Sequence, residues 1–131
     1  MPTDTPGPRP GAALQTIAMP ADTNANGDIF GGWLMGQMDL GASVLARSLA
    51  GGRVATVSVD GMRFLHPVRV GDVVSIFPTL AKRGRSSMTL NVEVRTFNAE
   101  TGLERRAAET RIVFVAIDLN GKPRPLPPAG D

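Results

Sequence analysis

The sequence predicts an α+β fold in which a curved antiparallel sheet wraps one long helix. The first observation is the stretch from Ile29 to Ala46, whose single charge, Asp39, stands in its middle. Its apolar side chains leave almost no polar face, so the helix must be covered on nearly every side. The second observation is a change from helical to alternating periodicity after Arg53, which indicates strands. In a chain this short, the cover has to be a curved sheet.

Length and composition indicate one globular domain. The chain has 131 residues, 42% of them hydrophobic and 20% charged, which is enough to bury roughly two thirds of the unfolded surface in a single core. A formal charge of +2 is too small to indicate a nucleic-acid partner. The lack of cysteine and the single histidine exclude thiolate chemistry and a histidine-rich metal cluster, so no metal is expected.

The folded domain is predicted to span residues 14–122. Residues 1–13 contain several prolines and no apolar run, which predicts a disordered tail rather than a targeting sequence. Residues 123–131 are a second proline-rich tail. The apolar stretch around Asp39 approaches a membrane span in length, but its glycines and its carboxylate, which opposes insertion by about 3 kcal/mol, argue against one. The expected location is therefore the cytoplasm.

A short strand and an ordered loop precede the helix. Leu14 to Met19 is apolar and ends at Pro20, which suits a strand. Residues 21–28 are rich in Asp, Asn, Thr and Gly, which form turns through their own backbone. At the end of this loop, Asp28 is expected to cap the helix or to lie in its first turn.

Glycine pairs mark both ends of the helix. Gly31 and Gly32 allow close backbone approach at the start, where unpaired N–H groups and the helix dipole favour a developing negative charge. Gly51 and Gly52 are expected to end the helix as a C-cap.

The rest of the chain is predicted to be strands joined by tight turns. The turns at Gly71-Asp72, Lys82–Arg85 and Asn98–Gly102 make successive strands antiparallel. Pro78 would interrupt a central ladder, so an edge or a bulge is expected there. With the first strand, a sheet of about five to six strands is predicted, and the four later strands cover Arg53–Asp60, Val73–Ala81, Ser87–Phe97 and Arg106–Asp118.

The chemistry is predicted to centre on Asp39. Inside the wrapping, this carboxylate is either a desolvated general base with a raised pKa or a buried aspartate satisfied by backbone donors. A serine triad is disfavoured because the one histidine, His66, precedes a proline in a loop or strand end. Ser43, on the same helical face as Asp39, is expected to be a packing or supporting residue. The remaining candidate groups are a carboxylate, side-chain amides and backbone N–H donors. Together they suit general-base hydrolysis of an acyl group.

A basic turn allows two interpretations. Lys82 and Arg83 lead into Gly84, Arg85, Ser86 and Ser87. Such a cluster is either a solvated turn or a phosphate site built from cations, hydroxyls and N–H groups. The spacing of these residues alone does not decide between the two interpretations.

Several motifs together resemble one family. The run MPADTNANGDIFGGWLMGQMDLG, the later VATVSVDGMRFLHPVRVGDVV, the KRGRSS turn and the closing VFVAIDLNGKPRPLPP resemble the bacterial YciA-type acyl-CoA thioesterases of the hotdog superfamily, over about residues 14 to 128. The resemblance implies a hotdog fold and two subunits paired edge to edge into a continuous sheet. It also implies a dimer as the active unit and a hexamer made as a trimer of dimers.

The resemblance also assigns roles to residues. Asp39 is implied as the catalytic carboxylate, Asn24 as the amide that places water or thioester, and Gly32 as the backbone donor to the thioester carbonyl. Substrate contacts are implied for Gly31, Thr56 and, at the nucleotide end of coenzyme A, Gly84, Arg85, Ser86 and Ser87. The glycine pair follows Phe30 where hotdog dehydratases need a histidine, which disfavours that activity.

The sequence therefore predicts an acyl-CoA thioesterase that releases a free acid and coenzyme A, with Asp39 as base or as nucleophile. No cofactor is expected, since coenzyme A is part of the substrate and product, and neither nucleic acid nor membrane is an expected partner. The alternative is a non-catalytic acyl-CoA-binding protein that acts as a sensor or regulator.

Overall fold

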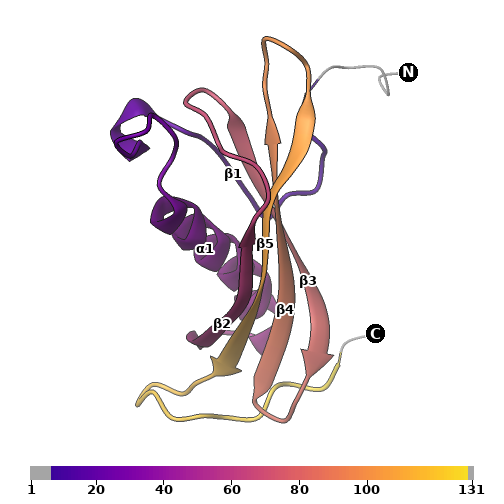
Figure 1. Cartoon of the computed structure of the whole chain (residues 1–131). Coiled ribbons are helices and arrows are strands. Elements are labelled where there is room, and N and C mark those ends of the chain that lie inside the picture. Colours follow the sequence, from indigo (N-terminus) through magenta and orange to yellow (C-terminus); the bar gives the residue numbers. More distant parts are fainter. Residues whose placement is uncertain (1–6, 130–131) are drawn as a thin grey trace, which may run out of the picture.

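A computed structural model describes residues 7–129 and shows one helix lying across a curved, fully antiparallel sheet (Figure 1). The sheet order is β1-β3-β4-β5-β2, and the predicted fold class is confirmed. A 3-10 turn, η2 (Pro20–Asp22), precedes the helix. The remaining elements are β1 (Leu14–Ile17), α1 (Gly31–Ala50), β2 (Val54–Phe64), β3 (Val73–Arg83), β4 (Ser87–Phe97) and β5 (Glu104–Ala116).

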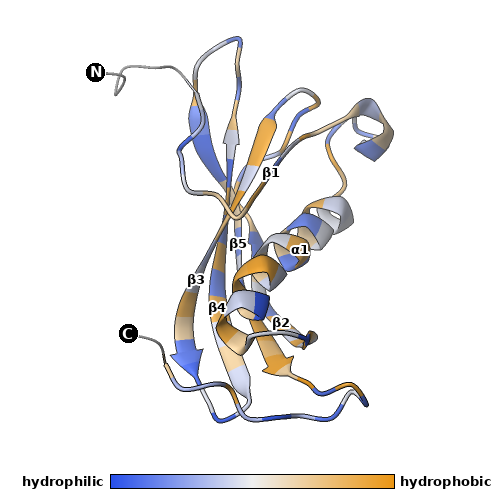
Figure 2. Cartoon of the chain, turned by 180° about the vertical axis from the view of Figure 1, so that it is seen from behind, coloured by the Kyte–Doolittle hydropathy of each residue, from blue (hydrophilic) through white to orange (hydrophobic). Residues whose placement is uncertain are grey.

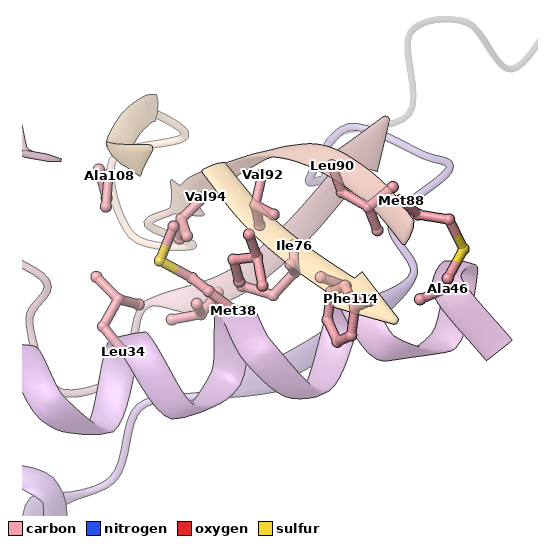
Figure 3. Close-up of a cluster of buried hydrophobic side chains, with 14 of the residues drawn as sticks. Leu34, Met38, Ala46, Ile76, Met88, Leu90, Val92, Val94, Ala108 and Phe114 are labelled. Atoms are coloured by element: carbon pink, nitrogen blue, oxygen red, sulfur yellow. The ribbon is translucent and has the colours of Figure 1, made fainter. Parts of the chain in front are cut away.

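The core lies between α1 and the sheet face that it crosses. Side chains of β4 at alternate positions, from Met88 to Val94, are buried, while the residues between them are more exposed, as the period of two predicts. They meet the buried helix residues Leu34 and Met38 and the ring of Phe114 (Figure 3). Burial of about 25 cal/mol for each Å² of apolar surface makes this contact the main source of stability.

Gly41 brings the helix close to β3. A Cβ atom added at Gly41 would lie 2.7 Å from Cγ2 and 2.8 Å from Cβ of Ile76, both near the backbone of β3. No side chain fits in this space. The glycine therefore sets the distance between the helix and the centre of the sheet.

The position of β2 was not predicted correctly. The turn at Gly71-Asp72 was expected to join neighbouring strands, but β2 pairs with β5 at the far edge of the sheet, and β3 pairs with β1 and β4. The loop 65–72 crosses the end of the sheet instead, and Leu65 begins it by donating to the Ala107 carbonyl at 2.8 Å. Periodicity identifies strands, but it carries no information on which strands are neighbours.

Pro78 lies at a local edge, as expected. Strand β1 pairs only with Val73 to Ile76 of β3, so beyond this point β3 has β4 alone as its neighbour. The missing N–H of Pro78 therefore interrupts no ladder on the open side. The bulge in β3 falls slightly later, between Leu80 and Lys82.

The expectation that the helix is covered on nearly every side is wrong for the single chain. The sheet covers one side of α1 (Figure 2), and Leu40 and Val44 are 54% and 47% exposed on the other. The neighbouring edge strand is exposed too, with Val57 at 56%. Apolar side chains on an open helix face beside an unpaired strand edge are typical of a surface that another chain covers.

Both ends of the described chain contact the domain. The backbone N–H of Arg9 donates to Glu104 at 2.9 Å, and its guanidinium lies 6.0 Å from the centre of the Phe77 ring. Leu126, near the other end, is only 9% exposed. The predicted N-terminal disorder thus does not describe residue 9, because polar and aromatic partners hold it, and the prediction for residues 1–6 falls outside the described residues. Nor does any described helix have the length and apolarity to cross a membrane.

Candidate active site

Asp39 lies in the middle of α1 on the side that faces β2. Its carboxylate is partly buried, and Oδ1 accepts a hydrogen bond of 2.7 Å from the hydroxyl of Thr56. Thr56 belongs to the exposed edge strand, so the carboxylate points to the open edge of the sheet. The resemblance implied a substrate contact for Thr56, and the structure places its hydroxyl against the Asp39 carboxylate.

Ser43 does not take part in this contact. Its hydroxyl donates to the Leu40 carbonyl at 2.7 Å, one turn earlier in its own helix. A side-chain bond to the preceding turn is the usual arrangement for a serine inside a helix.

The start of α1 presents free backbone donors. The first bond of the helix joins the N–H of Leu34 to the Phe30 carbonyl at 3.2 Å, and within residues 7–129 the N–H groups of Gly31, Gly32 and Trp33 have no acceptor. A Cβ at Gly32 would meet nothing within 4 Å, so a ligand can approach the backbone closely. Free N–H groups at the positive end of a helix dipole can stabilise an oxyanion.

Asp28 does not cap this helix. The residue at the cap is Phe30, which makes no side-chain bond, and Oδ1 of Asp28 lies 3.7 Å from the guanidinium of Arg69 instead. The cap prediction is therefore wrong. Because no side chain occupies the first donors, they stay open for a ligand.

Asn24 orders the loop before the helix. Its side-chain oxygen accepts the backbone N–H groups of Asn26 at 2.8 Å and Asp28 at 3.2 Å, and its own N–H donates to the Asp28 carbonyl at 2.7 Å. The N–H of Phe30 then ties the helix start to the Asp22 carbonyl at 2.9 Å. With its oxygen engaged, the Asn24 side chain offers its amide N–H group to a ligand.

Phe64 is a site residue that the sequence analysis missed. Its ring lies 3.1 Å from the position that a Cβ would take at Gly31, and the side chain is 52% exposed. The ring therefore lines the start of the helix beside the free donors. No pattern in the sequence predicts this contact, because Phe64 and Gly31 come from separate elements.

Within one chain, the predicted catalytic groups do not converge on one point. Gly32 and Asp39 are seven residues apart on α1, which is about 10 Å along the axis at 1.5 Å per residue. A thioester carbonyl oxygen needs its hydrogen-bond donor within about 3 Å, and the base must reach the water that attacks the carbon beside that oxygen. One chain therefore supplies the carboxylate with Thr56 at one place, and the donors with Asn24 at another.

The basic turn lies beyond the opposite end of the helix. It joins β3 to β4 close to the C-terminal end of α1 (Figure 1), about 27 Å along the axis from Gly32. The N–H of Gly84 donates to the Ser87 carbonyl at 2.8 Å, and a Cβ at Gly84 would lie 2.5 Å from the Ser87 hydroxyl. The Arg83 guanidinium binds the Pro127 carbonyl. Arg85 is exposed and, in the described part of the chain, has no side-chain partner.

The opposite face of the sheet holds a groove of about 530 Å³ that contains none of the predicted site residues. Three of its charged side chains pair with one another, since Arg106 binds Glu93 at 2.8 Å and also binds Glu109. The described residues also include no cluster of three or more His, Cys, Asp or Glu side chains able to hold a metal ion.

One long helix laid across a curved five-stranded antiparallel sheet is the hotdog fold, and the class of hotdog proteins that this chain matches is the thioesterases. The Thioesterase superfamily matches residues 26–103. Acyl-CoA thioester hydrolase YciA of Salmonella typhimurium is 54% identical over 120 residues, which cover 89% of this chain and 90% of the relative. The chain belongs to the YciA-type acyl-CoA thioesterases of the hotdog superfamily.

Solved structures agree with this family. The hexameric thioesterase y2039 from Yersinia pestis has a TM-score of 0.87 and 54% identity, covering 93% of this chain and 99% of that one. HI0827, a hexameric broad-specificity acyl-coenzyme A thioesterase, has a TM-score of 0.89 for its mutant and 44% identity, covering 93% and 90%. The similarity therefore extends over nearly the whole of each chain.

Proposed function

We propose that this protein hydrolyses acyl-CoA thioesters to a free carboxylic acid and coenzyme A, without a cofactor, in the cytoplasm. The observation that carries the proposal is the 2.7 Å bond from Thr56 to Oδ1 of Asp39, which holds a carboxylate at an open strand edge. A protein that only bound acyl-CoA would have no use for a positioned base. The family relationship supports the same activity.

In the proposed reaction, the Thr56 hydroxyl fixes one carboxylate oxygen of Asp39 and leaves the other for water. The carboxylate removes a proton as the water oxygen attacks the thioester carbon. The carbonyl oxygen becomes an oxyanion, which the N–H of Gly32 and the helix dipole stabilise. When the carbonyl forms again, the C–S bond breaks and the thiolate of coenzyme A takes up the proton. Direct attack by Asp39, with a mixed anhydride that water then cleaves, gives the same products.

The active site is proposed to form between two subunits. Gly32 and Asp39 lie about 10 Å apart along one helix, and this separation favours a site in which each chain supplies only one of them. A second copy that pairs along the open edge of β2 would cover Val57 and the exposed face of α1. The site then combines Asn24, Gly31 and Gly32 of one chain with Asp39 and Thr56 of the partner subunit.

The nucleotide end of coenzyme A is proposed to bind at the basic turn. Arg85 supplies an exposed cation, and Gly84, Ser86 and Ser87 supply N–H and hydroxyl groups, which together suit phosphate. The relatives y2039 and HI0827 are described as hexameric. On this basis three dimers are proposed to form a hexamer.

Release of free thiol from a panel of short, medium, long and aromatic acyl-CoAs tests the function. We expect turnover of at least one class, and the panel reports which acyl groups the site accepts. Tight binding of acyl-CoA without any release of thiol would instead favour the sensor or regulator.

A further inference from the structure

The C-terminal residues 123–128 run along the β3–β4 turn (Figure 1). The backbone N–H of Leu126 donates to the Arg85 carbonyl at 2.8 Å. On the other flank of the turn, the guanidinium of Arg83 binds the Pro127 carbonyl. The segment therefore holds the backbone of Arg85, whose exposed side chain has no partner among residues 7–129.

The same segment is fastened to three other elements. The N–H of Arg124 donates to the Ala116 carbonyl at the end of β5 at 2.9 Å. Its guanidinium donates to the carbonyls of Ile117 and Ala50 at 2.9 Å each, and to that of Arg53 at 3.4 Å. A cation beside the last carbonyls of α1 satisfies acceptors that the helix leaves unpaired and favours its dipole. Residues 123–128 thus join the turn to the ends of α1 and β5 and the start of β2.

The turn has few restraints of its own. Its internal backbone bond joins Gly84 to Ser87 at 2.8 Å, and the Ser86 carbonyl accepts the N–H of Ala116 at 2.8 Å. Residues 123–128 contain four prolines, which limit the conformations of the free segment and so reduce the entropy that its ordering costs. Leu126 adds a nearly buried side chain, 9% exposed, to the core. A stiff segment anchored in this way can hold the turn in one conformation.

We propose that residues 123–128 are a brace that positions the basic turn for the nucleotide end of coenzyme A, with Arg124 and Leu126 as positioning residues. This inference rests on the proposed function of the turn. A loop that is ordered before its ligand arrives loses less conformational entropy on binding. Because the nucleotide takes no part in the chemistry, the brace lowers KM for acyl-CoA and leaves kcat unchanged.

Leu126→Pro tests the brace because it removes the N–H that binds Arg85. Leu126 precedes Pro127, so its backbone is already restricted to extended conformations that proline can adopt. We compare kinetics on an acyl-CoA with kinetics on the pantetheine thioester of the same acid, which lacks the nucleotide. KM for acyl-CoA should rise by about tenfold at constant kcat, with kcat/KM for the pantetheine thioester within about twofold of wild type. Leu119→Ala, at an 85% exposed side chain in the preceding turn, is the control. It should change neither KM nor kcat for either substrate.

An unchanged KM in folded Leu126→Pro overturns the brace, and so does an equal loss with both thioesters, which is the result expected of a general structural defect. If Leu126→Pro does not fold, Arg124→Met removes the guanidinium bonds to Ile117, Ala50 and Arg53 and leaves the cations of the turn in place, and KM for the two thioesters is compared in the same way. Arg85→Ala separates this inference from the function on which it rests. If it leaves KM for acyl-CoA unchanged, or if the wild type releases no thiol, the proposed function has failed and the brace fails with it.

Discussion

At the scale of single residues, the contact between Thr56 and Asp39 is the feature on which the chemistry depends. An isolated charge on an otherwise apolar helix is costly to keep unless it has a partner or a function. Thr56 engages only one oxygen of the carboxylate, at 2.7 Å, which leaves the other free to accept a proton. The contact orients the group without neutralising it.

Asp39→Asn should reduce kcat by on the order of 10²-fold or more while the protein stays folded and binds acyl-CoA, because a positioned general base contributes about this much. The asparagine oxygen can still accept the bond from Thr56, so the shape of the site is retained. Thiol-release kinetics and binding of a coenzyme A product measure the two effects separately. Turnover near the wild-type rate in a folded variant would remove Asp39 from the mechanism.

Thr56→Val should lower kcat by about tenfold with little change in KM, because loss of one hydrogen bond to a charged group is worth about 1.5–3 kcal/mol at most. Valine has nearly the shape of threonine but no hydroxyl. Thr56→Ser, which keeps the hydroxyl, is the matched control and should retain most of the activity. Equal activity of the valine and serine variants would show that Thr56 does not position the base.

At the scale of elements, the close packing of α1 on β3 determines where Asp39 lies. The buried face of the helix is built from small residues, among them Gly41, Ala42 and Ala46, so the helix axis approaches the sheet closely. Any increase in this distance would also move the carboxylate away from Thr56. The packing and the site are therefore linked through one rigid helix.

Gly41→Ala should destabilise the protein even though alanine favours helices by about 1 kcal/mol. The new Cβ would lie 2.7 Å from Ile76, and overpacking of this kind costs about 1–3 kcal/mol. Chemical denaturation measures the free energy of unfolding. In an Ile76→Ala background the cost should shrink in part, since Cγ2 is gone while the Cβ of residue 76, at 2.8 Å, remains. An equal cost in both backgrounds would contradict this account of Gly41.

At the scale of the whole molecule, a single chain leaves surfaces open that a second subunit is proposed to cover. The sheet covers one face of α1 and leaves the edge of β2 unpaired. The donors of the helix start and the carboxylate lie about two turns apart. The proposal of a second subunit that completes the sheet and the active site together accounts for both facts.

Complementation tests the shared site. Asn24→Ala and Asp39→Ala, both expected to be inactive, are unfolded and refolded together so that about half of the dimers are mixed. In each mixed dimer one site carries both changes and the other carries neither, so activity should return to about a quarter of wild type. Native mass spectrometry confirms the mixing. Persistent inactivity of confirmed mixed dimers would show that both residues act within one chain, and would leave the role of Asp39 untouched.

The sequence by itself determined the features that depend on local periodicity. The bounds of β4 were predicted to the residue, because every second side chain faces the core. Gly51, with φ of 68°, ends the helix as expected, since a left-handed C-cap suits glycine. The family could also be predicted from the sequence, because its motifs are contiguous runs of residues.

Only the tertiary structure decided what depends on contacts between distant segments. It placed β2 beside β5 and left one face of α1 exposed. It also paired Asp28 with Arg69, so that Asp28 does not cap the helix. It also brought Phe64 onto Gly31 and residues 123–128 onto the basic turn. The physical reason is that a local pattern records which side of an element is buried, whereas its partner is chosen by the packing and hydrogen bonds of the whole chain.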